Sequence, residues 1–176
     1  SKLIESAWMQ GNDLDLAIVR VLRDDTDAVL PNHSTAAWSA DQTLAFAPEM
    51  KALGVEFFEQ PLKRDDWDGM RRVHAECVLP VIADESCQTE VDVARCAPYF
   101  DGINIKLSKA GGMTPARRMI REARERGLQV MIGCMSESSV GISAIAQFLP
   151  LLDHVDMDGA VLIAKESEAR LQLDPA

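Results

Sequence analysis

The chain has 176 residues, 47% of them apolar, which is enough to bury one substantial hydrophobic core but not two. Its formal net charge of -10 argues against nucleic acid as a partner, because phosphate binding needs clustered lysine and arginine. The one basic run, residues 117–126, alternates with acidic residues and is typical of the solvent-exposed face of a helix.

The four cysteines are scattered without a Cys-x-x-Cys pair, which indicates a reduced, intracellular chain. No stretch approaches the roughly twenty apolar residues that a membrane span requires. The N-terminal residues also lack the charged-then-apolar pattern of a signal peptide. We therefore expect a soluble, cytoplasmic protein without a membrane partner.

From residue 39 onward, amphipathic helices alternate with short apolar strands that end in polar residues. Ser39 and Gln42 form a capping-box pattern at the start of the first helix. Thr114 and Pro115 are suited to be the N-cap and the first residue of a later helix. Two weaker strands are expected before residue 39. After it, the expected helices are residues 40–53, 66–76, 89–96, 115–126 and 138–149, and the expected strands are residues 55–59, 80–84, 102–107, 128–133 and 154–158.

This alternation is typical of a parallel sheet. Glu59, Asp84 and Lys106 lie one strand-helix unit apart, so a closed barrel would bring them to the mouth where the C-terminal ends of its strands meet. A doubly wound sheet is the alternative, but its site usually lies at a single crevice. We therefore predict an α/β protein, a TIM-type (β/α) barrel in one domain. A complete barrel needs about 250 residues, so this one is expected to be incomplete.

Two carboxylates end successive strands. Glu59 follows Phe57-Phe58, and Asp84 follows Ile82-Ala83. Two carboxylates at one mouth suit a hard divalent cation such as Mg²⁺, which prefers oxygen ligands. The alternative is that strand ends are simply polar.

Lys106 shares a strand face with Asn104, opposite three apolar neighbours, so it is expected to point into the barrel. An inward lysine is costly unless it is paired or functional. Near a bound cation its pKa would be lowered, which suits a general base acting on a carbon acid. The alternative is a structural salt bridge to Asp84 or Glu59. Lys109 lies beyond the strand and is expected in a loop.

These segments, in this order, resemble the strand-end motifs of the muconate-lactonizing subgroup of the enolase superfamily. The resemblance covers residues 39–164, whereas residues 1–38 diverge from the family pattern. The motifs are Glu59-Gln60-Pro61, Ala83-Asp84-Glu85-Ser86, the run from Asn104 to Gly112, and the run from Gly133 to Gly141.

Within that subgroup, Asp156 and Asp158 resemble the Asp-x-Asp of dipeptide epimerases of the L-Ala-D/L-Glu type, where the pair holds the α-ammonium of the substrate. Both side chains would face the mouth from one strand. The alternative is a polar turn before Gly159. The resemblance further implies that Glu59 and Asp84 bind the metal, that Lys106 is one acid/base, and that the backbone of Cys134, Met135 and Ser136 contacts the substrate.

The implied reaction is a 1,1-proton transfer at the carbon α to a carboxylate, catalysed by an isomerase with Mg²⁺ as cofactor and a dipeptide as substrate. The cation would stabilise the charge that develops on the oxygens of an enediolate. A second lysine on the opposite face would complete the inversion.

The sequence departs from the family before residue 39. The family carries a Lys-x-Lys on an earlier strand and an Asp-x-Asn just before a tryptophan. Aligning Trp38 with that tryptophan places His33 at the aspartate and Thr35 at the asparagine, while residues 1–6 offer one lysine, Lys2. Imidazole suits zinc or iron better than magnesium, so His33 is the weakest candidate ligand. The N-terminal capping domain and the first barrel strand are expected to be absent.

Two classes of function remain open from the sequence. The first is an enzyme, with a muconate cycloisomerase or an o-succinylbenzoate synthase as the alternatives against which Asp156 and Asp158 argue. The second is a catalytically silent barrel fragment that associates with copies of itself or another chain through open strand edges. The missing second lysine favours the silent fragment, and the intact later motifs favour the epimerase.

Overall fold

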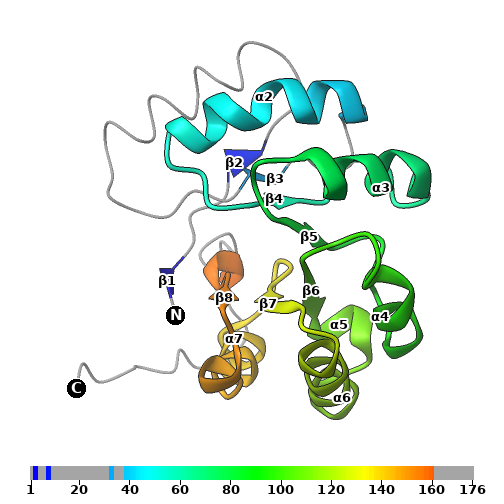
Figure 1. The fold of residues 1–176 in the computed structure, drawn as a ribbon. Helices are drawn as coiled ribbons and strands as arrows, with labels where there is room; N and C mark the ends of the chain where they lie inside the picture. The colour runs from blue at the N-terminus through cyan, green and yellow to red at the C-terminus, as the bar shows by residue number, and fades with distance from the viewer. Residues whose placement is uncertain (1, 4–6, 9–31, 34–37, 161–176) are drawn as a thin grey trace.

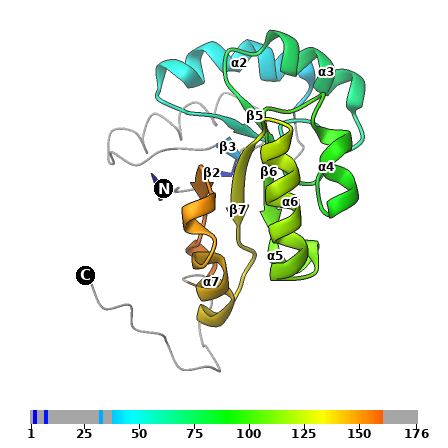
Figure 2. The same cartoon turned by 60° about the horizontal axis from the view of Figure 1, so that its bottom comes forward.

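The computed structural model describes residues 2–3, 7–8, 32–33 and 38–160, with side chains from Trp38 to Gly159. Within these residues, short parallel strands form one sheet in the order β1-β8-β7-β6-β5-β4-β3-β2. Figures 1 and 2 show the strands in the interior and the helices around them. The strands are β1 (Lys2–Leu3), β2 (Ala7–Trp8), β3 (Asn32–His33), β4 (Phe58–Glu59), β5 (Val81–Ala83), β6 (Gly102–Lys106), β7 (Gln129–Gly133) and β8 (His154–Val155).

The order of the strands is that of a barrel. From β3 to β8 each strand pairs with the next one in the chain, without the reversal that defines a doubly wound sheet. The two ends of the sheet, β1 and β2, are consecutive in the sequence. Leu3 and Ala7 can be at most about 14 Å apart, so the sheet curls back towards itself. The predicted partial (β/α) barrel is confirmed. The described residues before residue 39 contain three two-residue strands, where two strands were expected.

Within the described residues the chain forms six helices and two short 3-10 turns. All five expected strands are shorter than predicted, and the difference is largest for β4, which spans Phe58–Glu59, and β8, which spans His154–Val155. The helices are α2 (Ala40–Ala52), α3 (Trp67–Glu76), α4 (Glu90–Cys96), α5 (Leu107–Ala110), α6 (Met113–Glu125) and α7 (Ser139–Ala146), and the turns are η1 (Leu149–Leu151) and η2 (Asp158–Ala160).

Helix α2 begins with the predicted capping box. The Ser39 hydroxyl accepts from the Gln42 amide at 3.3 Å, and the Gln42 side chain accepts from the Ser39 amide at 2.9 Å. Two of the N-H groups that a helix leaves unsatisfied at its N-terminus are thereby paired.

Replacing Ser39 with alanine should therefore lower the free energy of unfolding by about 1 kcal/mol, or the melting temperature by roughly 2–4 °C. Thermal unfolding monitored by circular dichroism measures the effect. Thr114→Ala is the control, because Thr114 is an exposed residue inside α6. An equal loss in both variants would contradict a capping role for Ser39.

Helix α6 corrects one sequence-based prediction. Thr114 is not the N-cap, because the helix begins at Met113 with Gly112 before it. Gly111 and Gly112 have φ angles of 90° and 109°, a region that favours glycine, and they turn the chain from α5 into α6. Pro115 therefore lies within the first turn, where its missing N-H has no carbonyl to serve. The face predicted to be apolar is buried as expected: Ala116, Met119, Ile120 and Ala123.

The hydrophobic core has two parts. The larger cluster packs the helices against the outer face of the sheet, and a smaller one consists of Phe57, Ile82 and Met131. Side chains two residues apart on a strand share a face. Phe57 therefore shares its face with Glu59, and Ile82 with Asp84. The smaller cluster forms an apolar floor beneath the polar strand ends.

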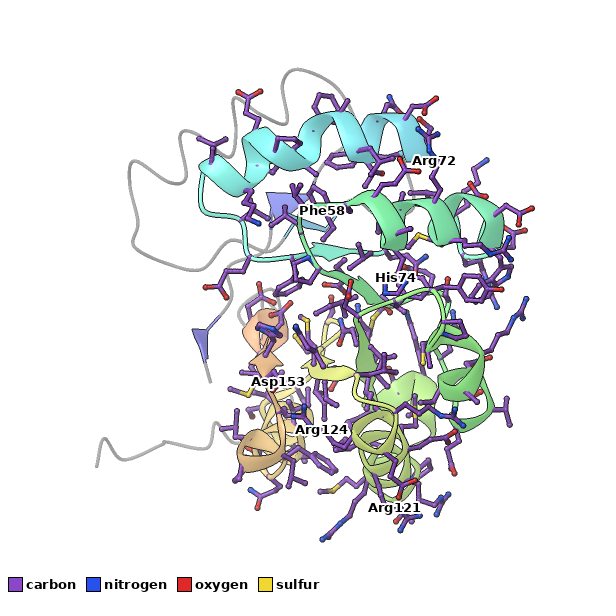
Figure 3. All side chains as sticks on the ribbon, in the orientation of Figure 1. Phe58, Arg72, His74, Arg121, Arg124 and Asp153 are labelled. Atoms are coloured by element: carbon purple, nitrogen blue, oxygen red, sulfur yellow. The ribbon has the colours of Figure 1, made fainter. Side chains whose placement is uncertain are left out.

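Ion pairs join neighbouring elements on the outside. Arg72 contacts Asp41 at 2.7 Å and ties α3 to α2, while Arg124 contacts Asp153 at 2.6 Å and ties α6 to the segment before β8 (Figure 3). These pairs are substantially exposed, so each contributes little to stability. Among the described residues, no helix has the length and apolar character needed to cross a membrane.

Candidate active site

Four polar side chains gather at the C-terminal ends of β4, β5 and β6. Glu59 ends β4, Asp84 follows β5, and Asn104 and Lys106 lie on β6. The two carboxylates are almost completely buried, with exposed fractions of 1% for Glu59 and 3% for Asp84. Charged groups are rarely buried to this extent unless they are paired or bind an ion. The alternative that these strand ends are simply polar does not explain such burial.

Direct contacts join the four side chains in two pairs. Asn104 Nδ2 donates to Glu59 Oε1 at 2.6 Å, and Lys106 Nζ lies 2.7 Å from Asp84 Oδ2. Asn104 and Lys106 share one face of β6, as the alternation predicted. Glu59, Asp84 and Lys106 therefore converge on one inner region of the barrel. The salt bridge between Lys106 and Asp84, which the sequence left as an alternative, is also present.

Lys109 belongs to the same cluster, and the prediction that it lies in a loop is wrong. It lies in α5, the helical turn that follows β6 directly, and its Nζ is 3.0 Å from Asp84 Oδ1. Lys106 and Lys109 are three residues apart, so a helical turn at the strand end brings both ammonium groups to one carboxylate. The Lys-x-x-Lys spacing brings both lysines together only if a helical turn follows β6 directly, which the sequence pattern did not predict.

The charges of this cluster shift the pKa values of its members. Burial alone would raise the pKa of Asp84, but the adjacent Lys106 and Lys109 outweigh it and lower that pKa. Burial alone would lower the pKa of Lys106, but Asp84, with a smaller contribution from Glu59, raises it above the usual value. In the protein without a cation, Lys106 is therefore a firmly protonated ammonium at neutral pH. The lowered pKa predicted from the sequence applies only beside a bound cation.

The chemistry of the site fits a hard divalent cation. Its carboxylates offer oxygen ligands above an apolar floor. Asn104 Oδ1 is also buried and has no hydrogen-bond partner among the described residues, which leaves an oxygen lone pair available next to Glu59. Gly133 faces this amide closely, since a Cβ there would lie 2.8 Å from Asn104 Nδ2. Any larger residue in place of Gly133 would therefore displace the Asn104 side chain.

His33 is placed beside these residues by its backbone alone. It ends β3 and is in register with Glu59 on β4. This is the neighbouring strand end, as the alignment through Trp38 predicted. The side chains of His33 and Lys2, and all of Thr35, lie outside the described part of the structure, so a ligand role for His33 stays a prediction.

A second polar group lies at the ends of β7 and β8. Cys134 Sγ is 3.9 Å from Asp156 Oδ1 and 3.7 Å from Asp158 Oδ1. Asp156 follows β8 directly, whereas Asp158 lies in η2, so the two do not share a strand as predicted. Burial, followed by the charge of Asp156, raises the pKa of the Cys134 thiol to about 12. The thiol is therefore neutral at pH 7, and the two aspartates supply the negative charge.

The loop of Cys134, Met135 and Ser136 is held in place by Gly159. The Gly159 amide donates to Cys134 Sγ at 3.1 Å, and a Cβ on Gly159 would overlap the Met135 carbonyl oxygen. Met135 and Ser136 are exposed, whereas Cys134 is buried. This loop is thereby fixed beside the two aspartates.

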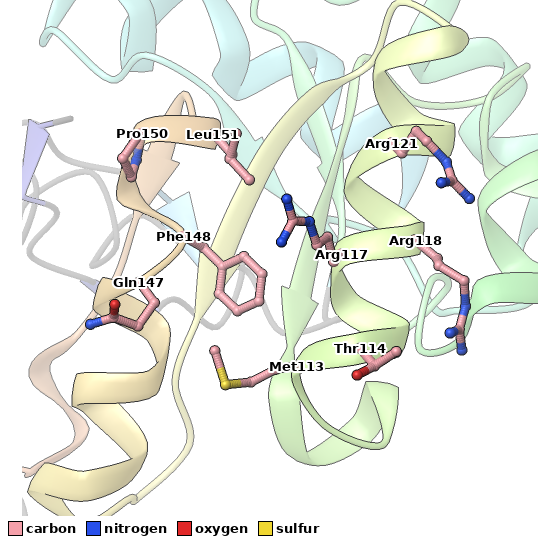
Figure 4. A pocket seen from close by; sticks show the side chains of 9 residues that line it. All are labelled: Met113, Thr114, Arg117, Arg118, Arg121, Gln147, Phe148, Pro150 and Leu151. Atoms are coloured by element: carbon pink, nitrogen blue, oxygen red, sulfur yellow. The ribbon is translucent and has the colours of Figure 1, made fainter.

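A separate cavity of about 750 Å³ lies on the outside of the barrel, between α6 and residues 147–151, which follow α7 (Figure 4). Met113, Arg117 and Phe148 are among its lining residues. Its lining includes none of the polar side chains at the strand ends, so this cavity is separate from the candidate active site.

Comparison with known proteins connects this geometry to a family. A sequence profile of the family described as enolase C-terminal domain-like matches residues 6–171. The chain belongs to this family. Its resemblance to the dipeptide epimerases of the superfamily is confirmed by the relatives that it matches.

The chain is 57% identical over 171 residues to an L-Ala-D/L-amino acid epimerase of Maribacter sp., covering 94% of this chain and 51% of that protein. It is 51% identical to an enzyme of the same name in Flavobacterium johnsoniae, with the same coverage. This member of the enolase C-terminal domain-like family therefore spans about half the length of these relatives.

A solved structure agrees with the sequence comparison. The dipeptide epimerase of Enterococcus faecalis V583, complexed with Mg and the dipeptide L-Leu-L-Tyr, superposes with a TM-score of 0.85 at 26% identity. The match covers 93% of this chain and 49% of that one. The fold shared with this family is therefore that of its barrel half.

Proposed function

We propose that this chain carries the site of a Mg²⁺-dependent dipeptide epimerase, which moves the proton at the carbon α to a carboxylate. One observation carries the proposal: Lys106 Nζ lies 2.7 Å from the buried carboxylate of Asp84, in a cluster that includes Glu59. A cation held by carboxylates next to a lysine is the arrangement that proton abstraction from a carbon acid needs. The names of the relatives support the same reaction.

Lys106 is the proton-transfer group in this proposal. It must be neutral to accept the α-proton, but its ion pair with Asp84 keeps it protonated. A divalent cation bound at Asp84, in addition to the two lysines, would lower the pKa of Lys106 and release that proton. The site should therefore be inactive without a divalent cation.

Glu59 and Asp84 are the proposed ligands, with His33 as a weaker third candidate. When bound, Mg²⁺ supplies positive charge that stabilises the enediolate oxygens and lowers the pKa of the nearby lysine. Asn104 holds Glu59 through its amide, which fixes the carboxylate on the inner face. Lys109 balances the remaining oxygen of Asp84.

The aspartates at β8 are the proposed contact for the substrate. Asp156 and Asp158 both lie next to the Cys134 thiol, and an α-ammonium group between them would satisfy two negative charges. The exposed residues Met135 and Ser136 follow Cys134 in the loop beside them. The same chemistry disfavours the cycloisomerase and synthase alternatives, whose substrates carry no ammonium group at this position.

A silent fragment is the second candidate, and the ends of the sheet favour it. The described sheet ends at β1 and β2, each only two residues long and paired on one side. Unpaired strand edges promote association between chains. Size-exclusion chromatography over a range of concentrations tests this candidate, which predicts concentration-dependent oligomers.

Proton exchange in deuterated water tests the proposed function directly. The chain is incubated with Mg²⁺ or with EDTA and a panel of dipeptides, and loss of the α-proton signal is followed by NMR. Exchange that requires Mg²⁺ and occurs without inversion indicates one working base, and inversion indicates a second. The absence of exchange with every dipeptide contradicts the proposal and leaves the silent fragment.

A further inference from the structure

We infer that Gln60 is a positioning residue that sets the distance between the proposed metal ligands Glu59 and Asp84. This inference rests on the proposed function, because it concerns the same cation site. Gln60 follows Glu59 directly and is itself buried, with an exposed fraction of 1%. A buried amide side chain at this place needs an explanation, since its four hydrogen-bonding capacities must be satisfied.

All four capacities of the Gln60 amide are used. Oε1 accepts from the backbone amides of Asp84 at 3.1 Å and Ser86 at 3.0 Å. Nε2 donates to the Leu62 carbonyl at 3.0 Å and to the Ser86 hydroxyl at 3.0 Å. One oxygen atom therefore holds the backbone on both sides of Glu85, beginning with Asp84 itself.

The backbone of Gln60 is adapted to this task. Its φ of 40° is the one positive value at a non-glycine position among the described residues. Such a conformation is strained in an L-residue and persists only where the surroundings impose it. The backbone N-H of Gln60 also donates to the Ile82 carbonyl on β5 at 2.9 Å. The left-handed turn ends the strand immediately after Glu59 and directs the Gln60 side chain to the end of β5.

Glu59 and Gln60, at the end of β4, thus connect this strand end to those of β6 and β5 respectively. Glu59 is fixed laterally by Asn104 on β6, and Asp84 is fixed by Gln60 from β4. The hydrogen-bond network extends outward, because the Ser86 hydroxyl donates to the Arg64 carbonyl at 2.9 Å. Groups that orient metal ligands typically alter metal affinity about 10–100-fold when they are removed.

The test is Gln60→Met, which keeps the length of the side chain and removes all four hydrogen bonds. Affinity for Mn²⁺ and Mg²⁺ is measured by titration calorimetry, and the bound Mn²⁺ is examined by electron paramagnetic resonance. We expect affinity to fall roughly 10–100-fold relative to the wild type, with a broadened Mn²⁺ spectrum. The measurement requires no substrate and no turnover.

Two controls separate positioning from general destabilisation. Ser86→Ala removes the hydroxyl but leaves both backbone amides on Gln60 Oε1, so metal affinity should stay close to that of the wild type. Val73→Ala destabilises the core from α3, where Val73 is fully buried, and should lower the melting temperature without changing metal affinity.

The outcomes are distinguishable. A Gln60→Met protein that binds Mn²⁺ as tightly as the wild type overturns the inference while the proposed function stands. A Val73→Ala protein that loses affinity in parallel with Gln60→Met also overturns it, because the effect would then be general destabilisation. A wild-type chain that binds neither cation removes the proposed function and the inference together.

Discussion

Lys106→Met should abolish Mg²⁺-dependent α-proton exchange while the barrel remains folded. Methionine fills a similar volume but cannot accept a proton, and loss of a general base typically lowers the rate about 10²–10⁴-fold. Asp84 keeps Lys109 as a partner at 3.0 Å, so the carboxylate is not left unpaired. Exchange rates from NMR and thermal unfolding by circular dichroism measure the two effects separately.

Lys109→Met is the matched control for this variant. Both lysines contact Asp84, at 2.7 Å and 3.0 Å, so each substitution removes one positive charge from the same carboxylate. Only Lys106 lies on the inner face of β6 with Asn104, whereas Lys109 reaches in from α5. Exchange should therefore fall far less in Lys109→Met. Equal losses in the two variants would mean that charge balance at Asp84, and not proton transfer, is the role of Lys106.

Much of the fold follows from local patterns in the sequence. The alternation of apolar strands and amphipathic helices predicted five helices and five strands after residue 39, and all of these elements are present. Periodicity locates an element better than it locates its ends, because the ends depend on specific backbone angles. The start of α6 illustrates this, since Gly112 with its φ of 109° ends the preceding turn where Thr114 offered the better side-chain cap.

The residues of the candidate site that lie at the ends of strands were predictable from the sequence. Glu59, Asp84 and Lys106 were predictable because parallel strands bring their C-terminal ends together. Lys109 and Gln60 were not, because both reach their partners through departures from regular structure. Lys109 depends on a helical turn directly after β6, and Gln60 on a left-handed backbone after β4. No periodicity argument contains either feature.

Asp84→Asn should cost more stability than any other single change at the site. Asp84 is the carboxylate shared by Lys106 and Lys109, and its side chain is 5% exposed. Removing one partner of a buried ion pair typically costs about 3–5 kcal/mol, because a charge is left buried without compensation. The melting temperature should therefore fall by roughly 6–20 °C. Calorimetric affinity for Mg²⁺ should be lost at the same time, since a proposed ligand is removed.

Glu85→Gln is the control for this variant, because it neutralises the adjacent carboxylate. Burial and then the charge of Asp84 raise the pKa of Glu85, so its charged form is already disfavoured and its loss should not destabilise the fold. Similar destabilisation in Glu85→Gln and Asp84→Asn would contradict a specific role for Asp84. It would indicate that any negative charge at this strand end supports the two lysines.

The dependence of this stability difference on pH follows from the two pKa shifts. The lysines hold the folded-state pKa of Asp84 below its unfolded value of about 3.9, so its stabilisation is fully present above about pH 4. It is lost as the pH falls through the folded-state pKa. Lys106 has a raised pKa, so its contribution is complete below about pH 10 and is lost above the folded-state value.

The difference in unfolding free energy between wild type and Asp84→Asn should therefore be constant from about pH 5 to pH 9 and shrink outside that window. A difference that declines between pH 5 and pH 7 would show that Asp84 is not held as an ion in the folded chain.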